Sequence, residues 1–387
     1  MPWTEIKPMD ARVLFVADHL RRLHAFSELC AGYGVSRKTG YKWIERYDRE
    51  GIAGLEEKSR RPHFQPAQLP YAVRQAILEL RHQGRIELGP KKIQALLASR
   101  YPDQPVPCRT TIYRVLKQAG QIMPRRLRRR VAPMANPLQP ARTANTLWSA
   151  DFKGQFLMRN AQWCYPLTVM DHASRYLLDC RALAGTRGRP TQTVFQTLFR
   201  RYGLPQRVPT DNGVPFASIG PGGLSRLSIW WIRLGIVPER IAPGQPQQNG
   251  RHERMHRTLK RAVTHPPASG VRAQQHCFDD FCHQYNTQRP HEALQQRTPA
   301  SAYTASSRPY PERLPELVYP SYQRTYQVST NGVIYYNRHT VYVGYLLAGE
   351  HVGLEPVGDG VNQVHFGRYR WAASMSAFSS QVAPASA

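Results

Sequence analysis

The sequence predicts a multidomain protein: α-helical helix-turn-helix units first, then an α/β domain with a mixed sheet, then a small all-β barrel. Three observations support this order. Apolar residues recur at helical spacing up to about residue 120. Strand-like runs interleave with amphipathic helices from Trp148 onward, and short alternating runs between glycines fill residues 325–371. A chain of 387 residues is long enough for two to four such units.

The charge balance indicates a polyanionic partner. Lys and Arg total 53 against 26 Asp and Glu, which gives a formal net charge of +27. Hydrophobic residues make up 41% of the chain, enough for real cores, so a low-complexity packing protein is disfavoured. There is no run of about 18 apolar residues and no signal-peptide pattern, so we expect no membrane contact. The six cysteines are scattered, which favours reduced thiols and a cytoplasmic location.

The first predicted domain, 1–62, has the layout of a helix-turn-helix. A short helix over 25–31 precedes the turn Gly32-Tyr33-Gly34, and a second helix opens at Val35 with Ser36 as its cap. Helical spacing turns Val35, Thr39, Trp43 or Ile44, and Tyr47 toward the core. The opposite face carries the candidate DNA contacts Arg37, Lys38, Tyr41 and Lys42. An ordinary helical hairpin with a solvated basic face is the alternative.

A second helix-turn-helix domain, winged-helix-like, is predicted at 63–123, with helices over 71–81, 89–98 and 109–117. Arg109, Thr110 and Arg114 are its candidate DNA contacts, and Cys108 is a weak cap for its third helix. The basic linker 124–144 follows. Its like charges repel, so it is either an arm along DNA phosphates or a solvated tether. The candidate contacts there are Arg125, Arg126, Arg128, Arg129 and Arg130.

Residues 145–306 form the predicted α/β domain. Strands are expected over 146–152, 164–170, 176–181 and 207–210, and helices over 191–202, 227–234 and 250–263. A Pro-rich linker at 307–322 leads to the all-β domain at 323–372, which includes strands over 332–336 and 339–343. The small and polar tail, 373–387, is expected to be disordered.

Three carboxylates of the α/β domain suit metal-assisted phosphodiester chemistry. Asp151 ends one predicted strand, Asp211 follows another, and Glu253 lies in the first turn of a basic helix. Such residues can converge at one sheet edge and hold two divalent ions about 4 Å apart. Hard oxygen ligands favour Mg²⁺ or Mn²⁺. A plain turn at Asp211 and a helix-dipole role for Glu253 are the alternatives.

Other groups compete with or support this triad. Asp171 is the rival first ligand, although it could instead cap Ser174 or pair with Arg175. Two cysteines beside two histidines, in the run 276–283, fit no standard zinc spacing. On the Glu253 helix a basic face could hold phosphates or merely be solvated. The candidate DNA contacts of this domain are Arg257 and Lys260, with Lys153 weaker.

Six ordered motifs resemble the integrase-like DDE transposases of bacterial insertion sequences. They are Trp148-Ser149-Ala150-Asp151, Asp171-His172-Ala173-Ser174-Arg175-Tyr176, Thr210-Asp211-Asn212-Gly213 with Phe216, Pro246-Gln247-Gln248-Asn249-Gly250 with Glu253, His256-Arg257-Thr258-Leu259-Lys260, and Tyr285-Asn286-Thr287-Gln288-Arg289-Pro290-His291-Glu292-Ala293-Leu294. The resemblance implies a ribonuclease-H-like core, donor-strand cleavage and strand transfer, with Asp151, Asp211 and Glu253 as metal ligands. Two departures stand out. Residues 212–252 make a 41-residue interval where the family usually has about 35, and no His/Cys zinc module precedes the core.

The expected function is therefore a transposase that binds terminal inverted repeats and transfers DNA strands. Joining two DNA ends requires at least two protomers, so a dimer or tetramer on double-stranded DNA is expected, at the bacterial nucleoid. Two alternatives remain. A catalytically silent DNA-binding regulator is mildly favoured by the long 212–252 interval, and a nuclease acting on RNA or hybrids is disfavoured by the two DNA-reading units.

Overall fold

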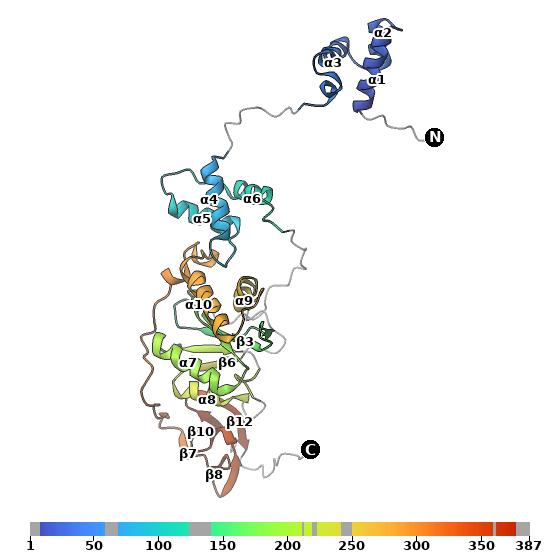
Figure 1. The fold of residues 1–387 in the computed structure, drawn as a ribbon. Coiled ribbons are helices and arrows are strands. Elements are labelled where there is room, and N and C mark those ends of the chain that lie inside the picture. The colour runs from blue at the N-terminus through green and yellow to red at the C-terminus, as the bar shows by residue number, and fades with distance from the viewer. Residues whose placement is uncertain are drawn as a thin grey trace, which may run out of the picture. The chain divides into compact units, whose positions relative to one another are not determined.

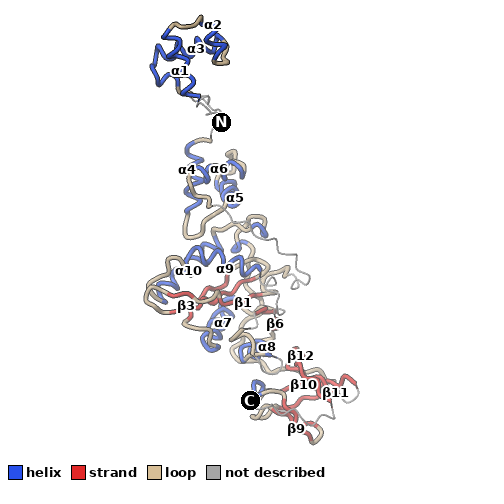
Figure 2. Tube along the Cα trace, turned by 90° about the vertical axis from the view of Figure 1, so that its right-hand side faces the viewer, coloured by secondary structure: helices blue, strands red, loops and turns tan. Residues whose placement is uncertain are grey.

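The computed structural model describes residues 8–58, 69–123, 141–210, 213–218, 223–240, 250–358 and 361–376. The chain forms two compact units, Met1–Leu69 and Pro70–Ala387, which are described separately. Figure 1 gives the element labels, and Figure 2 shows the helices and strands from the side.

The first unit contains α1 (Pro8–Arg21), α2 (Phe26–Gly32), α3 (Arg37–Glu50) and the short 3-10 helix η1 (Gly51–Leu55). The Ser36 hydroxyl accepts a hydrogen bond from the Thr39 N–H at 3.2 Å, so the predicted cap of α3 is confirmed. The predicted core face is also confirmed, because Val35, Trp43, Ile44 and Tyr47 pack on the core. That core consists of Phe15, Val16, Leu29, Cys30 and Leu55. Helix α1, which supplies two of these residues, was not predicted.

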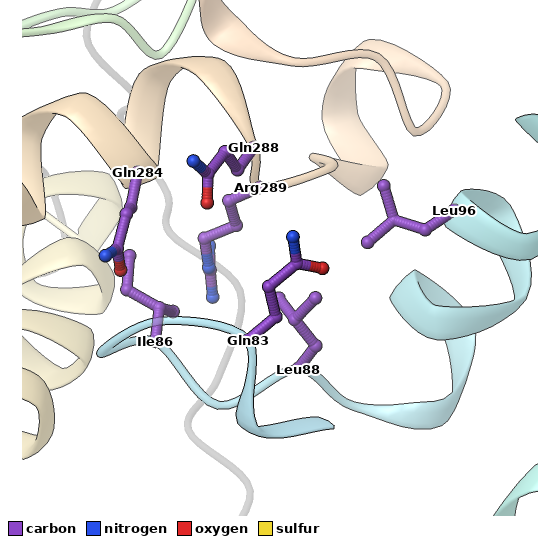
Figure 3. A pocket seen from close by; sticks show the side chains of 7 residues that line it. All are labelled: Gln83, Ile86, Leu88, Leu96, Gln284, Gln288 and Arg289. Atoms are coloured by element: carbon purple, nitrogen blue, oxygen red, sulfur yellow. The ribbon is translucent and has the colours of Figure 1, made fainter. Parts of the chain in front are cut away.

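The second unit begins with α4 (Tyr71–His82), α5 (Pro90–Arg100) and α6 (Arg109–Gln118), close to the predicted helices. The α4–α5 loop docks on the α/β domain. Its Ile86 is buried in a cluster with Phe278 and Phe281, and the Arg85 N–H donates to the Gln284 side chain at 2.8 Å. Figure 3 shows this loop facing the end of α10, where Gln284 and Arg289 converge on it.

The α/β domain is built on a mixed sheet. Its strands are β1 (Trp148–Phe152), β2 (Phe156–Leu157), β3 (Trp163–Asp171), β4 (Leu177–Leu183), β5 (Arg207–Thr210) and β6 (Val237–Arg240). Strand β3 pairs antiparallel with β1, β2 and β4, and β5 pairs parallel with β6. A parallel bridge between Leu147 and Arg207 joins the two halves, which gives the order β4-β3-β1-β5-β6. The predicted mixed sheet is thus present.

Helices cover both faces of this sheet (Figure 1). On one face α7 (Gly188–Tyr202) and α8 (Arg226–Arg233) bury Phe195, Phe199 and Trp231 against Trp148. On the other face lie α9 (Gly250–Val263) and α10 (Val271–Thr287). The sequence predicted α7, α8 and α9 but neither α10 nor the strands β2 and β6.

Two further 3-10 turns, η4 (Glu292–Leu294) and η5 (Pro299–Ser301), follow α10. The stretch 307–322, predicted as a linker, has no helix or strand but is fastened to the α/β domain. The Arg308 guanidinium donates to the carbonyl groups of Pro205, Leu234 and Gly235.

The C-terminal strands are β7 (Arg324–Gln327), β8 (Val333–Tyr336), β9 (His339–Tyr342), β10 (His351–Gly358), β11 (Val361–Phe366) and β12 (Tyr369–Ser376), with the 3-10 turn η6 (Tyr345–Leu347). They form a four-stranded sheet, β12-β11-β10-β7, and a β8–β9 hairpin. Among the described residues no strand pairing closes these sheets, so the barrel stays a prediction. Strand β12 continues to Ser376, so the predicted tail overlaps a strand at its start.

Candidate active site between β1 and α9

Asp151 lies on β1 opposite Thr168 of β3. Its carboxylate is 18% exposed, so a ligand from solvent can reach it, and its Oδ2 lies 3.7 Å from His256 Nδ1. Lys153 follows just past the end of β1 and is half-buried. Asp151 therefore sits at an accessible end of the sheet, next to α9.

Helix α9 has one apolar and one charged face. His252, Met255, His256, Leu259 and Val263 are buried at helical spacing. The exposed face carries the predicted ligand Glu253, in the first turn, and the predicted phosphate contacts Arg257 and Lys260. The packing of the buried face of α9 against the sheet therefore determines where Glu253, Arg257 and Lys260 are exposed.

Two buried histidines clamp α9 to the sheet. His252 Nδ1 lies 2.7 Å from the Ser149 hydroxyl, and its Nε2 lies 2.6 Å from Thr168 Oγ1. His256 Nε2 lies 2.7 Å from the same Thr168 oxygen. That hydroxyl also donates to the Asp151 carbonyl at 3.0 Å. One hydroxyl thus links both histidines to the backbone of the proposed metal ligand.

Both imidazoles are neutral. Burial lowers the pKa of His252 to about 3. Burial also lowers the pKa of His256 well below its usual value, and the neighbouring His252 ring and Lys153 ammonium lower it further. The clamp therefore brings no charge next to Asp151 at neutral pH.

Asp171, the rival ligand, is committed to a turn. It is fully buried, its Oδ1 accepts from the Asn145 N–H at 2.8 Å, and its Oδ2 accepts from the N–H and hydroxyl of Ser174 at 2.8 and 2.6 Å. Burial raises its pKa, which these hydrogen bonds counteract. This arrangement favours Asp151 as the accessible carboxylate.

The remaining predicted site residues are exposed or lie outside the described residues. Arg37, Lys38, Tyr41 and Lys42 are exposed on α3, and Arg109, Thr110 and Arg114 are exposed on α6. Asp211 and the arginines at 125, 126 and 128–130 lie outside the described residues. Sequence reasoning missed the His252–His256 clamp, although the i,i+4 spacing of two histidines on the buried face of an amphipathic helix was a usable signal.

Comparison with known proteins places this site in a family context. Two families described as integrase core domain match residues 141–246 and 234–299. A helix-turn-helix domain matches residues 14–63, and a homeodomain-like domain matches residues 39–116. These matches cover the helical N-terminal region and the α/β domain.

Related proteins come from bacterial insertion elements. The chain is 26% identical to an uncharacterized 39.2 kDa protein of insertion element IS476 from Xanthomonas euvesicatoria, over 66% of this chain and 71% of that protein. It is 27% identical to an uncharacterized 31.7 kDa protein of IS407 from Burkholderia multivorans, over 58% and 78% of the respective chains.

Among solved structures, a simian T-cell lymphotropic virus intasome in complex with PP2A regulatory subunit B56 gamma has a chain 17% identical to this one. The match covers 80% of this chain and 99% of that chain, with a TM-score of 0.38. A TM-score of this size does not assign a fold by itself. Within the part of the chain that the structure describes, no helix has the length and apolarity to cross a membrane. The chain thus matches helix-turn-helix and homeodomain-like families ahead of integrase core families, and it is similar to proteins of bacterial insertion elements, which supports an integrase-like transposase.

Proposed function

We propose that the chain binds the terminal inverted repeats of its element, nicks donor DNA to expose 3′-hydroxyls, and joins these to target DNA. The integrase core match supports phosphodiester transfer, and the helix-turn-helix matches support DNA binding. The observation that carries the proposal is the clamp of α9 on β1 and β3, because it sets Glu253 on the helix whose His256 approaches Asp151.

The strand register supports Asp211 as the third ligand. β1 and β5 meet at the parallel bridge between Leu147 and Arg207. β5 ends at Thr210, the residue before Asp211 in the chain, and Thr210 stands as far from its bridge residue as Ala150 does from Leu147. The end of β5 therefore reaches the edge of the sheet where Asp151 lies, which is the arrangement that shared metal ligation needs.

The donor set fits a hard divalent cation. Asp151, Asp211 and Glu253 would hold two Mg²⁺ or Mn²⁺ ions, because carboxylate oxygens are the ligands such ions prefer. When bound, such a pair activates the attacking oxygen and stabilises the leaving one in an in-line displacement. The neutral His252 and His256 leave the negative charge of the carboxylates undiminished.

The remaining residues position and hold DNA. Thr168 fixes the backbone at Asp151 through its hydroxyl, and His252 fixes the first turn of α9. Arg257 and Lys260 on the exposed face, with Lys153 beside Asp151, would hold phosphates. Two DNA ends require two protomers or more, so we expect a dimer or tetramer on DNA, acting at the nucleoid.

The test uses purified full chain, the repeats that flank its reading frame, and Mg²⁺ or Mn²⁺. Asp151→Asn and Glu253→Gln should each lower strand transfer by more than roughly 100-fold, the most that changing a group hydrogen-bonded to a metal ligand usually costs, while DNA binding persists. The matched controls Asp103→Asn and Glu312→Gln change exposed acids outside the site and should keep full activity. Strand transfer that survives either site variant contradicts the assignment. Binding without any metal-dependent cleavage selects the regulator instead.

A further inference from the structure

A cleft of about 540 Å³ lies where the second helix-turn-helix unit meets the turn after α10. Helices α5 and α6 both begin at this cleft, so the positive ends of both helix dipoles lie beside it. Its functional side chains are Lys91, Lys92, Arg109, Thr110, Tyr113 and Glu292. Three cations against one carboxylate make it an anion-attracting space.

Glu292 is the carboxylate in this cleft. It forms an ion pair with Lys91, while the Lys92 ammonium donates to the Pro290 carbonyl. Burial lowers the pKa of Lys92 to about 7, and the charge of Arg289 lowers it further, although Glu292 counteracts this. Lys91 and Arg109 alone still bring two positive charges to the cleft against the one carboxylate.

A second group of cations flanks the first turn of α9, next to Glu253. The Arg175 guanidinium donates to the His172 carbonyl at 2.8 Å, and Arg251 donates to the same oxygen at 3.4 Å. Burial lowers the pKa of Arg175 to about 10, and Arg251 and Arg254 lower it further. Within the described part of the chain, none of these three arginines forms a salt bridge. Guanidinium groups held together in this way attract an anion.

His291 stands just before Glu292 in the turn after α10, and its ring packs edge-on against the Tyr285 ring with 4.8 Å between the centroids. Burial lowers the pKa of His291 to about 3, and the charges of Arg289, Lys92 and Arg175 lower it further. Its Nε2 is buried without a hydrogen-bond partner among the described residues. The Arg289 guanidinium lies over the Tyr285 ring, 5.4 Å from its centroid. Basic side chains thus lie at the cleft, over Tyr285 and beside the first turn of α9.

We propose that this cationic strip, from Arg109 and Lys91 through Arg175 to Arg251 and Arg254, binds the phosphates of one strand of the transposon-end DNA. The strand passes from the second helix-turn-helix unit to α9, and it displaces Glu292 from Lys91. The phosphates supply the negative charge that the arginines lack, and their binding releases condensed counterions. The inference rests on the proposed function, since it delivers this strand to Asp151 and Glu253.

The first test is equilibrium binding of the full chain to fluorescent 40-base-pair duplexes, one with the end repeat and one unrelated, without divalent metal. Lys91→Gln and Arg254→Gln should each weaken binding and lower the slope of log K against log salt by about 0.9. Glu292→Gln should tighten binding by roughly threefold to tenfold, because it removes the competing anion. Misfolding cannot produce that gain. Arg313→Gln, an exposed arginine in the 307–322 stretch, is the control and should change neither quantity.

The second test uses Cys108, the exposed thiol that precedes α6 and is the chain neighbour of the cleft residue Arg109. Bound duplex should slow its alkylation by a maleimide. The strip is wrong if Lys91→Gln and Arg254→Gln keep the affinity and salt slope of the unmodified chain, or if Cys108 reacts equally fast with DNA present. Metal-free binding separates this result from the proposed function. If the duplex binds the cationic strip but is never cut, the transposase proposal alone is contradicted. If the duplex is cut but the strip variants leave its affinity and salt slope unchanged, the strip proposal alone is contradicted.

Discussion

The residue that organises the candidate site is Thr168, and its importance comes from hydrogen-bond satisfaction. One hydroxyl serves two imidazoles and a backbone carbonyl in a buried setting. An unpaired buried polar group costs about 1–3 kcal/mol, so each partner depends on the others. The site is therefore held by polar groups that a hydrophobicity pattern does not reveal.

The buried histidines predict a pH-dependent stability. The pKa of His252 is about 3 in the folded chain and about 6.5 when unfolded. Between these values the unfolded state binds a proton that the folded state does not, so the free energy of unfolding falls as pH falls. The loss is about 1.4 kcal/mol per pH unit for one such histidine. Urea unfolding from pH 6.0 to 5.0, followed by tryptophan fluorescence, measures it.

The matched variants isolate one histidine. His252→Asn should reduce the pH slope by about one proton, although it lowers stability at pH 7.5 by breaking the clamp. His283→Asn, on the exposed side of α10, should leave the slope unchanged. Equal slopes for His252→Asn and the unmodified chain would show that His252 is not held neutral.

From the sequence Asp151 was favoured over Asp171 as a ligand, and that choice stays a prediction. Both residues lie near the ends of strands, and the structure shows that the carboxylate oxygens of Asp171 accept hydrogen bonds from Asn145 and Ser174. The partners of Asp171 include a residue 26 positions away, which no local pattern connects. The α9 histidines were visible in the sequence, but their partners on β1 and β3 were not.

Among the elements, predictability followed the strength of the periodic pattern. Helix α9 was predicted with its observed bounds, because apolar and basic residues alternate cleanly along it. Helix α10 was missed because it buries polar residues. The Asn286 amide pairs with both backbone groups of Leu177, and Gln275 pairs with Ala182 and Cys180. These side-chain amides form hydrogen bonds with the backbone N–H and carbonyl groups on the outer edge of β4. Helix α10 thus protects the edge of the sheet through polar contacts that a hydropathy pattern does not reveal.

Gly54 tests the packing of the first unit. η1 lies so close to α3 that a Cβ at this position would stand 2.2 Å from the Arg46 carbonyl oxygen, a backbone atom. Gly54→Ala should therefore destabilise the first unit by about 1–3 kcal/mol. Gly32→Ala at the end of α2 meets nothing within 4 Å and should be neutral or slightly stabilising. Thermal unfolding of the full chain measures both, and equal melting temperatures would refute the close approach.

In the molecule as a whole, the predicted domains share cores. Ile229 and Ile232 of α8 belong to the same hydrophobic cluster as Val364 and Phe366 of the C-terminal sheet. Ile86 of the second helix-turn-helix unit belongs to the cluster of α9 and α10. Composition shifts mark where a chain changes character, but they do not show that two such segments bury one another's side chains. The predicted order of elements was therefore informative, while their mutual packing had to come from the structure.

The docking of Ile86 predicts that DNA reading and cutting are mechanically coupled. Ile86→Ala leaves a cavity beside Phe278 and Phe281, and the usual cost of about 2–4 kcal/mol should appear as local opening of the α4–α5 loop. Hydrogen exchange at the Arg85 amide, which is bonded to Gln284, should quicken, while exchange in β3 stays slow. The control Ile52→Ala, at a 62% exposed position, should change neither.

Loosening the α4–α5 loop should also change where DNA is nicked, because α6 belongs to the helical unit that this loop holds against the α/β domain. On end-repeat DNA the Ile86→Ala protein should bind with nearly unchanged affinity but nick at scattered positions, since the recognition helix no longer holds a fixed distance from Asp151. Sequencing of the nicked ends measures that scatter. A single unchanged nick position, together with fast exchange at Arg85, would mean that the loop anchors the fold without setting the register of cleavage.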